Sequence, residues 1–103
     1  MMIAIWQFTA KFGYKQEAIA LIQEWNEQIG SQTNIDMSAV RLTTGSVGAS
    51  EGVVYTEIPI DGLGDLQAFF DKIATVEMHQ DWGRRMGEMI VSGSTRWEIL
   101  RVV

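Results

Sequence analysis

The sequence predicts an α+β domain in which strands and helical regions follow one another in the order βαββαβ. Three observations support this order. Segments rich in β-branched and aromatic residues, with alternating or continuous apolar character, are typical of strands and occupy residues 2–9, 38–47, 53–60 and 95–103. Apolar residues with helical spacing occupy residues 14–29 and 63–90. Glycine-containing turn signals separate most of these segments.

Composition favours one compact domain that spans residues 1–103. Hydrophobic residues form 47% of the chain and include four tryptophans, so disorder is excluded. A chain of 103 residues is typical of a single domain. Because cysteine is absent, neither a disulfide framework nor a Cys–His metal scaffold can form, and we expect no metal site.

The charge of the chain restricts its partners. Lys and Arg number 8 against 13 Asp and Glu, which gives a net charge of −5, and the basic residues do not cluster; we therefore expect no nucleic-acid partner. No apolar run approaches the roughly 18 residues of a membrane-spanning helix, so we expect no membrane partner. The first residues carry no basic targeting region, from which we expect a cytoplasmic protein.

The first strand and the first helix have distinct patterns. Both parities of residues 2–9 are apolar, which indicates a strand covered on both faces. The apolar side chains of residues 14–29 share one helical face: Ala18, Leu21, Ile22, Trp25 and Ile29. Trp25 is therefore predicted to be buried between this helix and the sheet. Gly30 is predicted to end the helix in a left-handed conformation.

Residues 38–47 and 53–60 are predicted to form an antiparallel hairpin. With the turn centred near Ala49, Arg41 lies opposite Glu57 and Thr43 opposite Tyr55, and opposed residues share a face. Arg41 and Glu57 are then placed to orient a ligand, although a simple cross-strand ion pair explains them equally well.

The second helical region is predicted to be split at Ala74–Thr75, with Thr75 as the N-cap of a helix that continues to about Ile90. Gly83 and Gly87 lie one turn apart in this helix, where each glycine costs about 1 kcal/mol relative to alanine. We expect them to permit close approach of the sheet, another helix or a ligand.

The order βαββαβ is that of the ferredoxin-like fold, with the first and third strands central in a four-stranded antiparallel sheet. Two helical regions can cover only one face of this sheet. The other face retains apolar side chains, and such a patch typically marks an interface or a ligand groove. Face-to-face packing of two sheets covers both patches, so we expect a homodimer joined through its sheets. The alternative is a monomer with a partly hydrated face.

Several stretches resemble a known superfamily. Residues 3–9 read IAIWQFT and are followed by KFG and by Glu17-Ala18; residues 66–70 read LQAFF, and residues 79–82 read HQDW. This pattern resembles the dimeric α/β-barrel superfamily, which includes antibiotic-biosynthesis-type monooxygenases, haem-degrading monooxygenases, muconolactone-isomerase-like proteins and stress-responsive barrel proteins. The resemblance implies the fold and the dimer, whereas the activities of its members are diverse.

Haem degradation is disfavoured within this superfamily. For haem-degrading members the resemblance implies an Asn on the first strand, a Trp on the second helix and a His further along. Aligned on Gly13, the chain has Trp6 at the Asn position, and the Trp position falls near Phe70 or Lys72. The His position falls near Trp82 rather than His79. We therefore expect no haem, and no motif indicates another cofactor.

Trp6, Tyr55 and His79 are the leading site candidates. His79 is the only histidine, so no His-based triad or multi-His metal site can form within one chain. It is a candidate general base or haem ligand, or else a surface or interface histidine. If Trp6 and Tyr55 both face the open side of the sheet, they wall a pocket near the split helical region; interface packing is the alternative.

Two functions follow as expectations. The first is a cofactor-independent monooxygenase or isomerase acting on an aromatic or polyketide-like substrate. In it Trp6, Arg41 and Glu57 bind the substrate, while His79 and Tyr55 are catalytic. The second is a non-catalytic, stress-related or structural dimer in which the same cleft is filled. An open cavity with convergent polar groups would favour the first, and dry aromatic packing the second.

Overall fold

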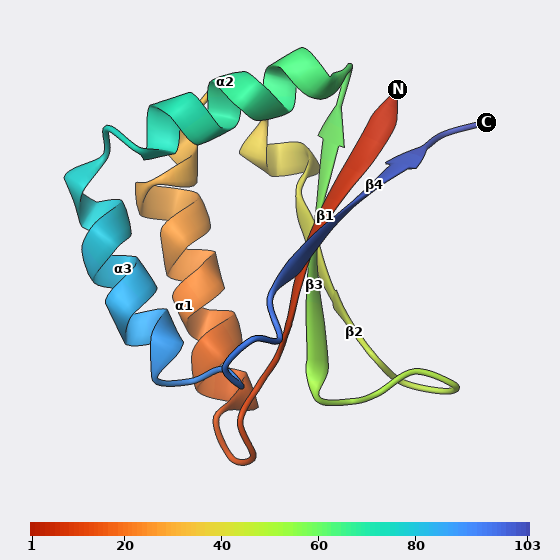
Figure 1. Ribbon diagram of the computed structural model, residues 1–103, viewed down its shortest axis with the longest axis vertical. Helices are drawn as coiled ribbons and strands as arrows, with labels where there is room; N and C mark the ends of the chain where they lie inside the picture. The colour runs from red at the N-terminus through yellow and green to blue at the C-terminus, as the bar shows by residue number, and fades with distance from the viewer.

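The computed structural model describes residues 1–103 and contains one four-stranded sheet and three α-helices. The antiparallel strands are β1 (Met2–Thr9), β2 (Arg41–Thr44), β3 (Val53–Ile60) and β4 (Arg96–Arg101), in the spatial order β2-β3-β1-β4. The helices α1 (Lys15–Gln28), α2 (Leu63–Ile73) and α3 (Glu77–Gly87) all lie on one side of the sheet (Figure 1). The predicted ferredoxin-like α+β fold is confirmed.

The alternation of β3 decides which side chains face the helices. Every second residue of β3 is buried: Val54, Thr56, Ile58 and Ile60. The β1–β3 register places Trp6 opposite Thr56 and Phe8 opposite Val54, and directly opposed residues share a face. The even-numbered residues of both central strands therefore point toward the helices.

The core between the helices and the sheet has two adjacent parts. One surrounds Trp25, whose exposed fraction is 8% and which packs with residues of β1 and β3. The other surrounds Phe8 and Met86. Trp82 is half-buried and packs against both. The predicted burial of Trp25 between the first helix and the sheet is confirmed.

The end of α1 differs from the prediction. Gly30 does not adopt a left-handed conformation; it begins a short 3-10 helix, η1 (Gly30–Gln32). A Cβ atom at Gly30 would lie 2.7 Å from Cε of Met37. A side chain at this position would therefore displace the flexible end of the Met37 side chain, which packs against the Gly30 backbone.

Two predictions about the second helical region are wrong, although the break between α2 and α3 is confirmed. Val76 rather than Thr75 is the N-cap of α3, and the Thr75 hydroxyl instead donates a hydrogen bond to the Lys72 carbonyl at 2.7 Å. A Cβ atom at Gly83 or Gly87 would meet no other atom within 4 Å. Neither glycine is therefore needed for close approach.

Strand β2 is shorter than the range 38–47 because its predicted beginning forms a 3-10 helix, η2 (Met37–Ala39). Asp36 caps this turn by accepting hydrogen bonds from the backbone N–H of Ser38 at 3.0 Å and from the Ser38 hydroxyl at 2.6 Å. These hydrogen bonds lower the pKa of Asp36 below its ordinary value.

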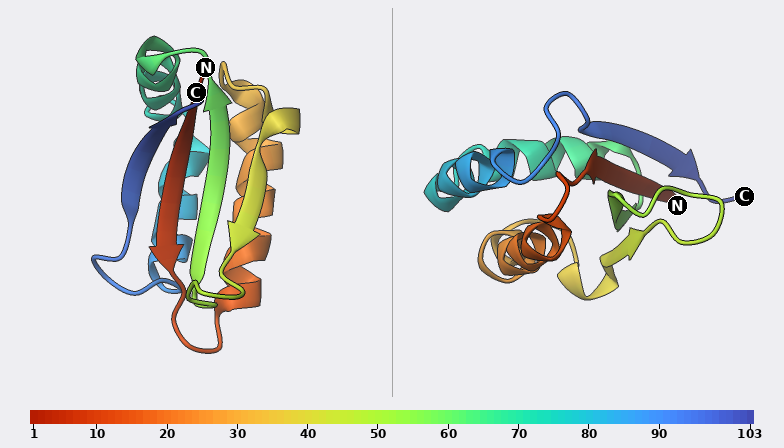
Figure 2. Two further views of the ribbon diagram at one scale, coloured as in Figure 1. Left: turned by 90° about the vertical axis from the view of Figure 1, so that its right-hand side faces the viewer. Right: turned by 90° about the horizontal axis from the view of Figure 1, so that it is seen from below.

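No helix covers the second face of the sheet, which we call the open face (Figure 2). The strand register places on it several apolar side chains that are half-buried or exposed: Ile3, Ile5, Val53, Tyr55, Pro59 and Leu100. None of the helices is long and apolar enough to cross a lipid bilayer.

Candidate functional site

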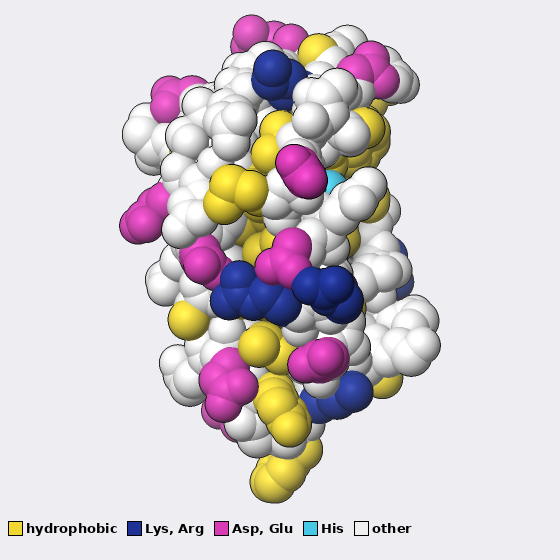
Figure 3. Space-filling view, turned by 90° about the vertical axis from the view of Figure 1, so that its left-hand side faces the viewer, with side chains coloured by type: hydrophobic (Ala, Val, Ile, Leu, Met, Phe, Trp, Pro, Cys, Tyr) yellow, Lys and Arg dark blue, Asp and Glu magenta, His cyan; other side chains and the backbone are white.

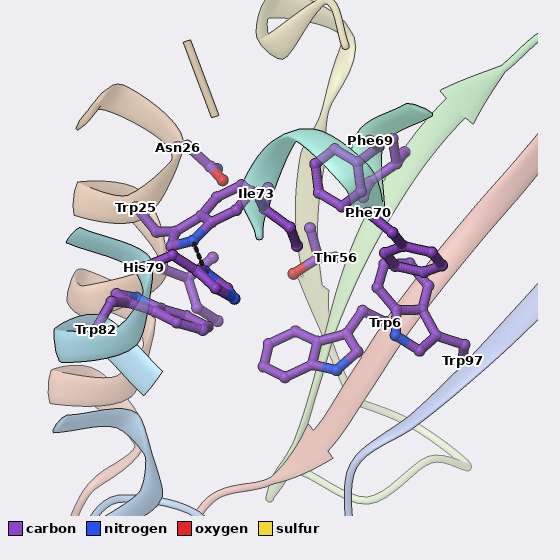
Figure 4. A pocket seen from close by; sticks show the side chains of 12 residues that line it. Trp6, Trp25, Asn26, Thr56, Phe69, Phe70, Ile73, His79, Trp82 and Trp97 are labelled. Atoms are coloured by element: carbon purple, nitrogen blue, oxygen red, sulfur yellow. Dashed lines mark hydrogen bonds between the residues drawn. The ribbon is translucent and has the colours of Figure 1, made fainter. Parts of the chain in front are cut away.

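A cavity of about 250 Å³ lies between the helices and the covered face of the sheet. Nine of its 12 lining residues are hydrophobic, and all four tryptophans of the chain are among them (Figure 4). The lining residues are Trp6, Ile22, Trp25, Asn26, Thr56, Ile58, Phe69, Phe70, Ile73, His79, Trp82 and Trp97. An apolar cavity with a few polar groups is the usual form of a small-molecule site.

The pairing of the strands determines which side chains of the sheet line the cavity. Trp6 lies opposite Thr56 on β3 and opposite Trp97 on β4, so these three side chains form one row across the covered face. Phe70 of α2 closes the β4 end of this row, because its ring meets that of Trp97 edge-on with centroids 5.2 Å apart. The ring of Trp6 also approaches that of Trp82, with centroids 6.0 Å apart.

Residues of α1 and α3 form the opposite wall of the cavity. Trp25 and Asn26 of α1 line this wall together with His79 and Trp82 of α3. His79 and Trp82 lie three residues apart and so on one side of their helix. The indole N–H of Trp82 donates to the carbonyl of Leu21 at 3.0 Å, which fixes this ring against α1. Most of the cavity wall is thus held by regular elements.

His79 is held by two tryptophans. The indole N–H of Trp25 donates a hydrogen bond to Nδ1 of His79 at 3.0 Å (Figure 4). The imidazole also stacks on Trp82, with ring centroids 5.6 Å apart and an interplanar angle of 17°. Burial lowers the pKa of His79 below 6.5, so the neutral imidazole is favoured at pH 7.

The Trp25 hydrogen bond also decides which nitrogen of His79 carries the proton. An indole N–H can only donate, so Nδ1 must accept, and the proton of the neutral ring is on Nε2. No other side chain pairs with Nε2, which extends toward the middle of the cavity (Figure 4). His79 is thereby prepared to donate a hydrogen bond rather than to act as a general base.

Two further polar atoms belong to the cavity lining. Oδ1 of Asn26 and Oγ1 of Thr56 are buried and have no hydrogen-bond partner in the chain. Thr56 is 6% exposed. We did not predict either residue as part of a site. A threonine on the buried parity of a central strand, between Val54 and Ile58, is a signal in the sequence that could have identified one of them.

The structure separates the predicted site residues into two groups. Trp6 and His79 line the cavity, but Tyr55 lies opposite Gln7 and not opposite Trp6. Tyr55 therefore faces the open face, as do Arg41 and Glu57. The condition that Trp6 and Tyr55 share the open side of the sheet is not met. Trp6 pairs with Thr56, and Tyr55 is the neighbour of Thr56 on β3, so its side chain points to the opposite face.

The polar residues of the open face form their own cluster. Arg41 lies opposite Glu57 and Thr43 opposite Tyr55, as predicted. Nε of Arg41 donates to Glu57 at 2.9 Å, and the Thr43 hydroxyl donates to the second Glu57 oxygen at 2.8 Å. This geometry corresponds to the simple cross-strand ion pair, with the Arg41 side chain 74% exposed.

The outer surface of the helices carries both polar and exposed hydrophobic side chains. Acidic, basic and hydrophobic side chains are interspersed on it, and the single histidine is visible as a small area beside an acidic side chain (Figure 3). Arg85 of α3 pairs with Glu24 of α1 at 3.1 Å. His79 is thus accessible from outside while its ring extends toward the cavity.

No family model matches the chain, and no curated protein matches its sequence. Solved structures do match its fold. An uncharacterized NIPSNAP domain protein from Burkholderia xenovorans is 16% identical, with a TM-score of 0.75 over 100% of this chain and 95% of that chain. A NIPSNAP family protein from Agrobacterium tumefaciens is 20% identical, with a TM-score of 0.74 over 100% of this chain and 94% of that chain.

A third solved structure with a similar fold is described by an enzymatic activity. A protein described as an antibiotic biosynthesis monooxygenase is 14% identical, with a TM-score of 0.70 over 100% of this chain and 99% of that chain. Likeness at these identities shows a shared fold and does not transfer a function. The chain therefore has the ferredoxin-like fold of these NIPSNAP and monooxygenase structures, as its resemblance to the dimeric α/β-barrel superfamily implied.

Proposed function

We propose that the chain binds a small, flat aromatic molecule in the cavity and that His79 donates a hydrogen bond from Nε2 to an oxygen of this ligand. The observation that carries the proposal is the Trp25–His79 hydrogen bond inside a cavity with aromatic walls. It leaves one N–H donor extending toward the cavity, where the indole rings offer flat faces for stacking.

The volume restricts the size of the ligand. An apolar cavity of about 150 Å³ is large enough to bind benzene. A cavity of about 250 Å³ therefore suits one ring or two fused rings. A larger polyketide would have to leave part of its ring system outside.

The chemistry of the lining limits the reaction that this site supports. His79 is the only titratable group in the wall, and its Nδ1 is already used by Trp25. The site thus offers a donor for a developing oxyanion but no free base. It suits an isomerase or a cofactor-independent monooxygenase whose substrate ionises readily to an enolate. Oxygenation of a methylene group to a carbonyl consumes one dioxygen and releases one water.

The lack of a free base also favours a second candidate, a binding protein without turnover. Oxygen uptake with β-tetralone, a two-ring ketone with an acidic methylene group, separates the two. Uptake that exceeds the rate of a His79→Phe variant, with a product that has gained oxygen in place of two hydrogens, supports the enzyme. Binding of β-tetralone without oxygen uptake and without any other conversion of the ketone supports the non-catalytic protein.

We also propose that two chains pair through their open faces. The support is the row of apolar side chains there, which no helix covers, among them Ile5, Tyr55 and Leu100. Arg41 of the edge strand β2 lies at the rim of the same face and pairs with Glu57, which lies on the central strand β3 opposite Ile5. Tyr55, Arg41 and Glu57 then serve the interface instead of the cavity.

Calorimetric titration with acetophenone and ethylbenzene tests the binding proposal. The two molecules have similar shapes, but only acetophenone has an oxygen acceptor. His79→Phe should weaken acetophenone binding on the order of tenfold relative to ethylbenzene, because it removes the N–H donor. Tyr55→Phe is the matched control on the open face and should change neither affinity. Absence of binding by both molecules, or equal effects of the two variants, contradicts the proposal.

A further inference from the structure

Two buried oxygens of the cavity lining lack partners. Oδ1 of Asn26 and Oγ1 of Thr56 accept no hydrogen bond from the chain, and the Thr56 hydroxyl donates none. The two residues come from α1 and from β3, on two different walls of the cavity. Their side chains are directed toward the space between the α1–α3 wall and Trp6 (Figure 4).

Such atoms are costly in a folded chain. Most buried polar groups have a hydrogen-bond partner, and an unpaired one carries its full desolvation cost. Valine has the same shape as threonine and would remove this cost at position 56, where the neighbours along the strand are Val54 and Ile58. Fold stability alone therefore does not explain the hydroxyl of Thr56.

The chemistry of the three polar groups defines a complementary ligand. The carbonyl oxygen of Asn26 only accepts, the hydroxyl of Thr56 accepts and donates, and Nε2 of His79 only donates in the tautomer that Trp25 fixes. A ligand that satisfies all three needs a hydroxyl or N–H group as well as an oxygen acceptor. Apolar ring surface must lie between them, because the rest of the lining is mostly aromatic.

We propose that the ligand is a one- or two-ring hydroxylated aromatic ketone or a close chemical equivalent. Its hydroxyl hydrogen-bonds to Asn26 and Thr56, while its carbonyl accepts from His79. This inference rests on the proposed function and adds the donor group to it. Three contacts from α1, β3 and α3 would fix the orientation of the ring, so Asn26 and Thr56 are the residues that determine specificity.

Calorimetry with four similar benzene derivatives, which differ only in the presence of the carbonyl and the hydroxyl group, tests the inference. Para-hydroxyacetophenone has both groups, acetophenone only the carbonyl, para-ethylphenol only the hydroxyl, and ethylbenzene neither. The wild-type chain should prefer para-hydroxyacetophenone over acetophenone on the order of tenfold, as expected for a hydrogen bond to a buried group that otherwise lacks one. Thr56→Val and Asn26→Leu should each reduce this preference while retaining acetophenone binding.

Thr43→Val is the matched control, because Thr43 lies on the open face and makes its own hydrogen bond to Glu57. It should leave the preference intact. Thr56→Val should also unfold at the same or a higher temperature than the wild type, which shows that its loss of preference is not a loss of fold.

The outcomes distinguish the two proposals. Equal affinity of the wild type for para-hydroxyacetophenone and acetophenone overturns the inference. The proposed function still stands in that case, because acetophenone binds in the cavity. A preference that both cavity variants retain also overturns the inference, because the hydroxyl of the ligand then does not bind Asn26 or Thr56. If none of the four compounds binds, the proposed function fails and the inference fails with it.

Discussion

The indole N–H of Trp25 donates a hydrogen bond to Nδ1 of His79 across 54 residues of sequence. It joins α1 to α3 at the wall of the cavity, and Trp82 holds the other side of the imidazole by stacking. This one contact fixes the tautomer of His79 and directs its N–H toward the space where a ligand would lie.

Trp25→Phe is expected to raise the pKa of His79. The indole N–H stabilises the neutral imidazole, and phenylalanine keeps an aromatic ring in place without this donor. Because His79 is the only histidine, its ring protons can be followed by NMR titration without assignment. An unchanged pKa would show that burial alone sets its value and that the hydrogen bond is not formed in solution.

The stability of the chain should depend on pH through His79. Its pKa in the folded chain lies below the ordinary value of 6.5, so the unfolded chain binds a proton that the folded chain rejects. The free energy of unfolding is therefore greatest above pH 6.5 and falls as the pH drops below it. Urea unfolding between pH 7.5 and about 5, where carboxylates remain mostly ionised, measures this change. His79→Phe should flatten the profile in this window, and a profile that keeps its slope contradicts the assignment.

The pattern of the fold could be read from the sequence because strand and helix periodicities differ. Residues 2–9 and 53–60 match β1 and β3, and the hairpin pairing of Arg41 with Glu57 is correct. Short-range spacing determines all of these features. The capping of α3 was not predictable in the same way, since Thr75 has a competing partner one turn back in α2.

The site was harder to predict because it depends on long-range register. Both parities of β1 are apolar, so nothing within residues 2–9 shows whether Trp6 faces the helices. Glu57 is charged and therefore belongs on the face that no helix covers. Tyr55 lies two residues before it on β3 and so points to the same face. The contact of Trp25 with His79 joins two helices whose relative rotation no local pattern determines. The buried parity of Thr56 was also visible in advance.

Gly83→Ala should stabilise the chain. Gly83 lies inside α3, its φ is not positive, and an added Cβ would meet no atom within 4 Å. Alanine is favoured over glycine in a helix interior by about 0.5–1 kcal/mol. Gly13→Ala is the matched control and should destabilise, because Gly13 has a φ of 88°. Thermal unfolding measures both, and a destabilised Gly83→Ala variant would mean that the space beside α3 is occupied in solution.

A charge on the open face should separate the proposed dimer. Ile5 lies near the middle of this face, opposite Glu57 on β3 and Glu98 on β4. Ile5→Lys would place an ammonium group within the interface, whereas Leu63→Lys changes an exposed leucine of α2 on the helix side. Light scattering should show a dimer for the wild type and Leu63→Lys, and a monomer for Ile5→Lys. A wild-type monomer at micromolar concentration contradicts the dimer.

The most direct test of the central claim, that a small aromatic ligand binds between the helices and the covered face of the sheet, uses the four indole N–H signals. All four tryptophans line the cavity, whereas Tyr55 lies on the opposite face of the sheet. Addition of para-hydroxyacetophenone to labelled protein should shift the indole signals of Trp6 and Trp25 in the NMR spectrum and leave the ring signals of Tyr55 unchanged. Shifts confined to Tyr55 and its neighbours, with unmoved indole signals, would contradict the account and place binding on the open face.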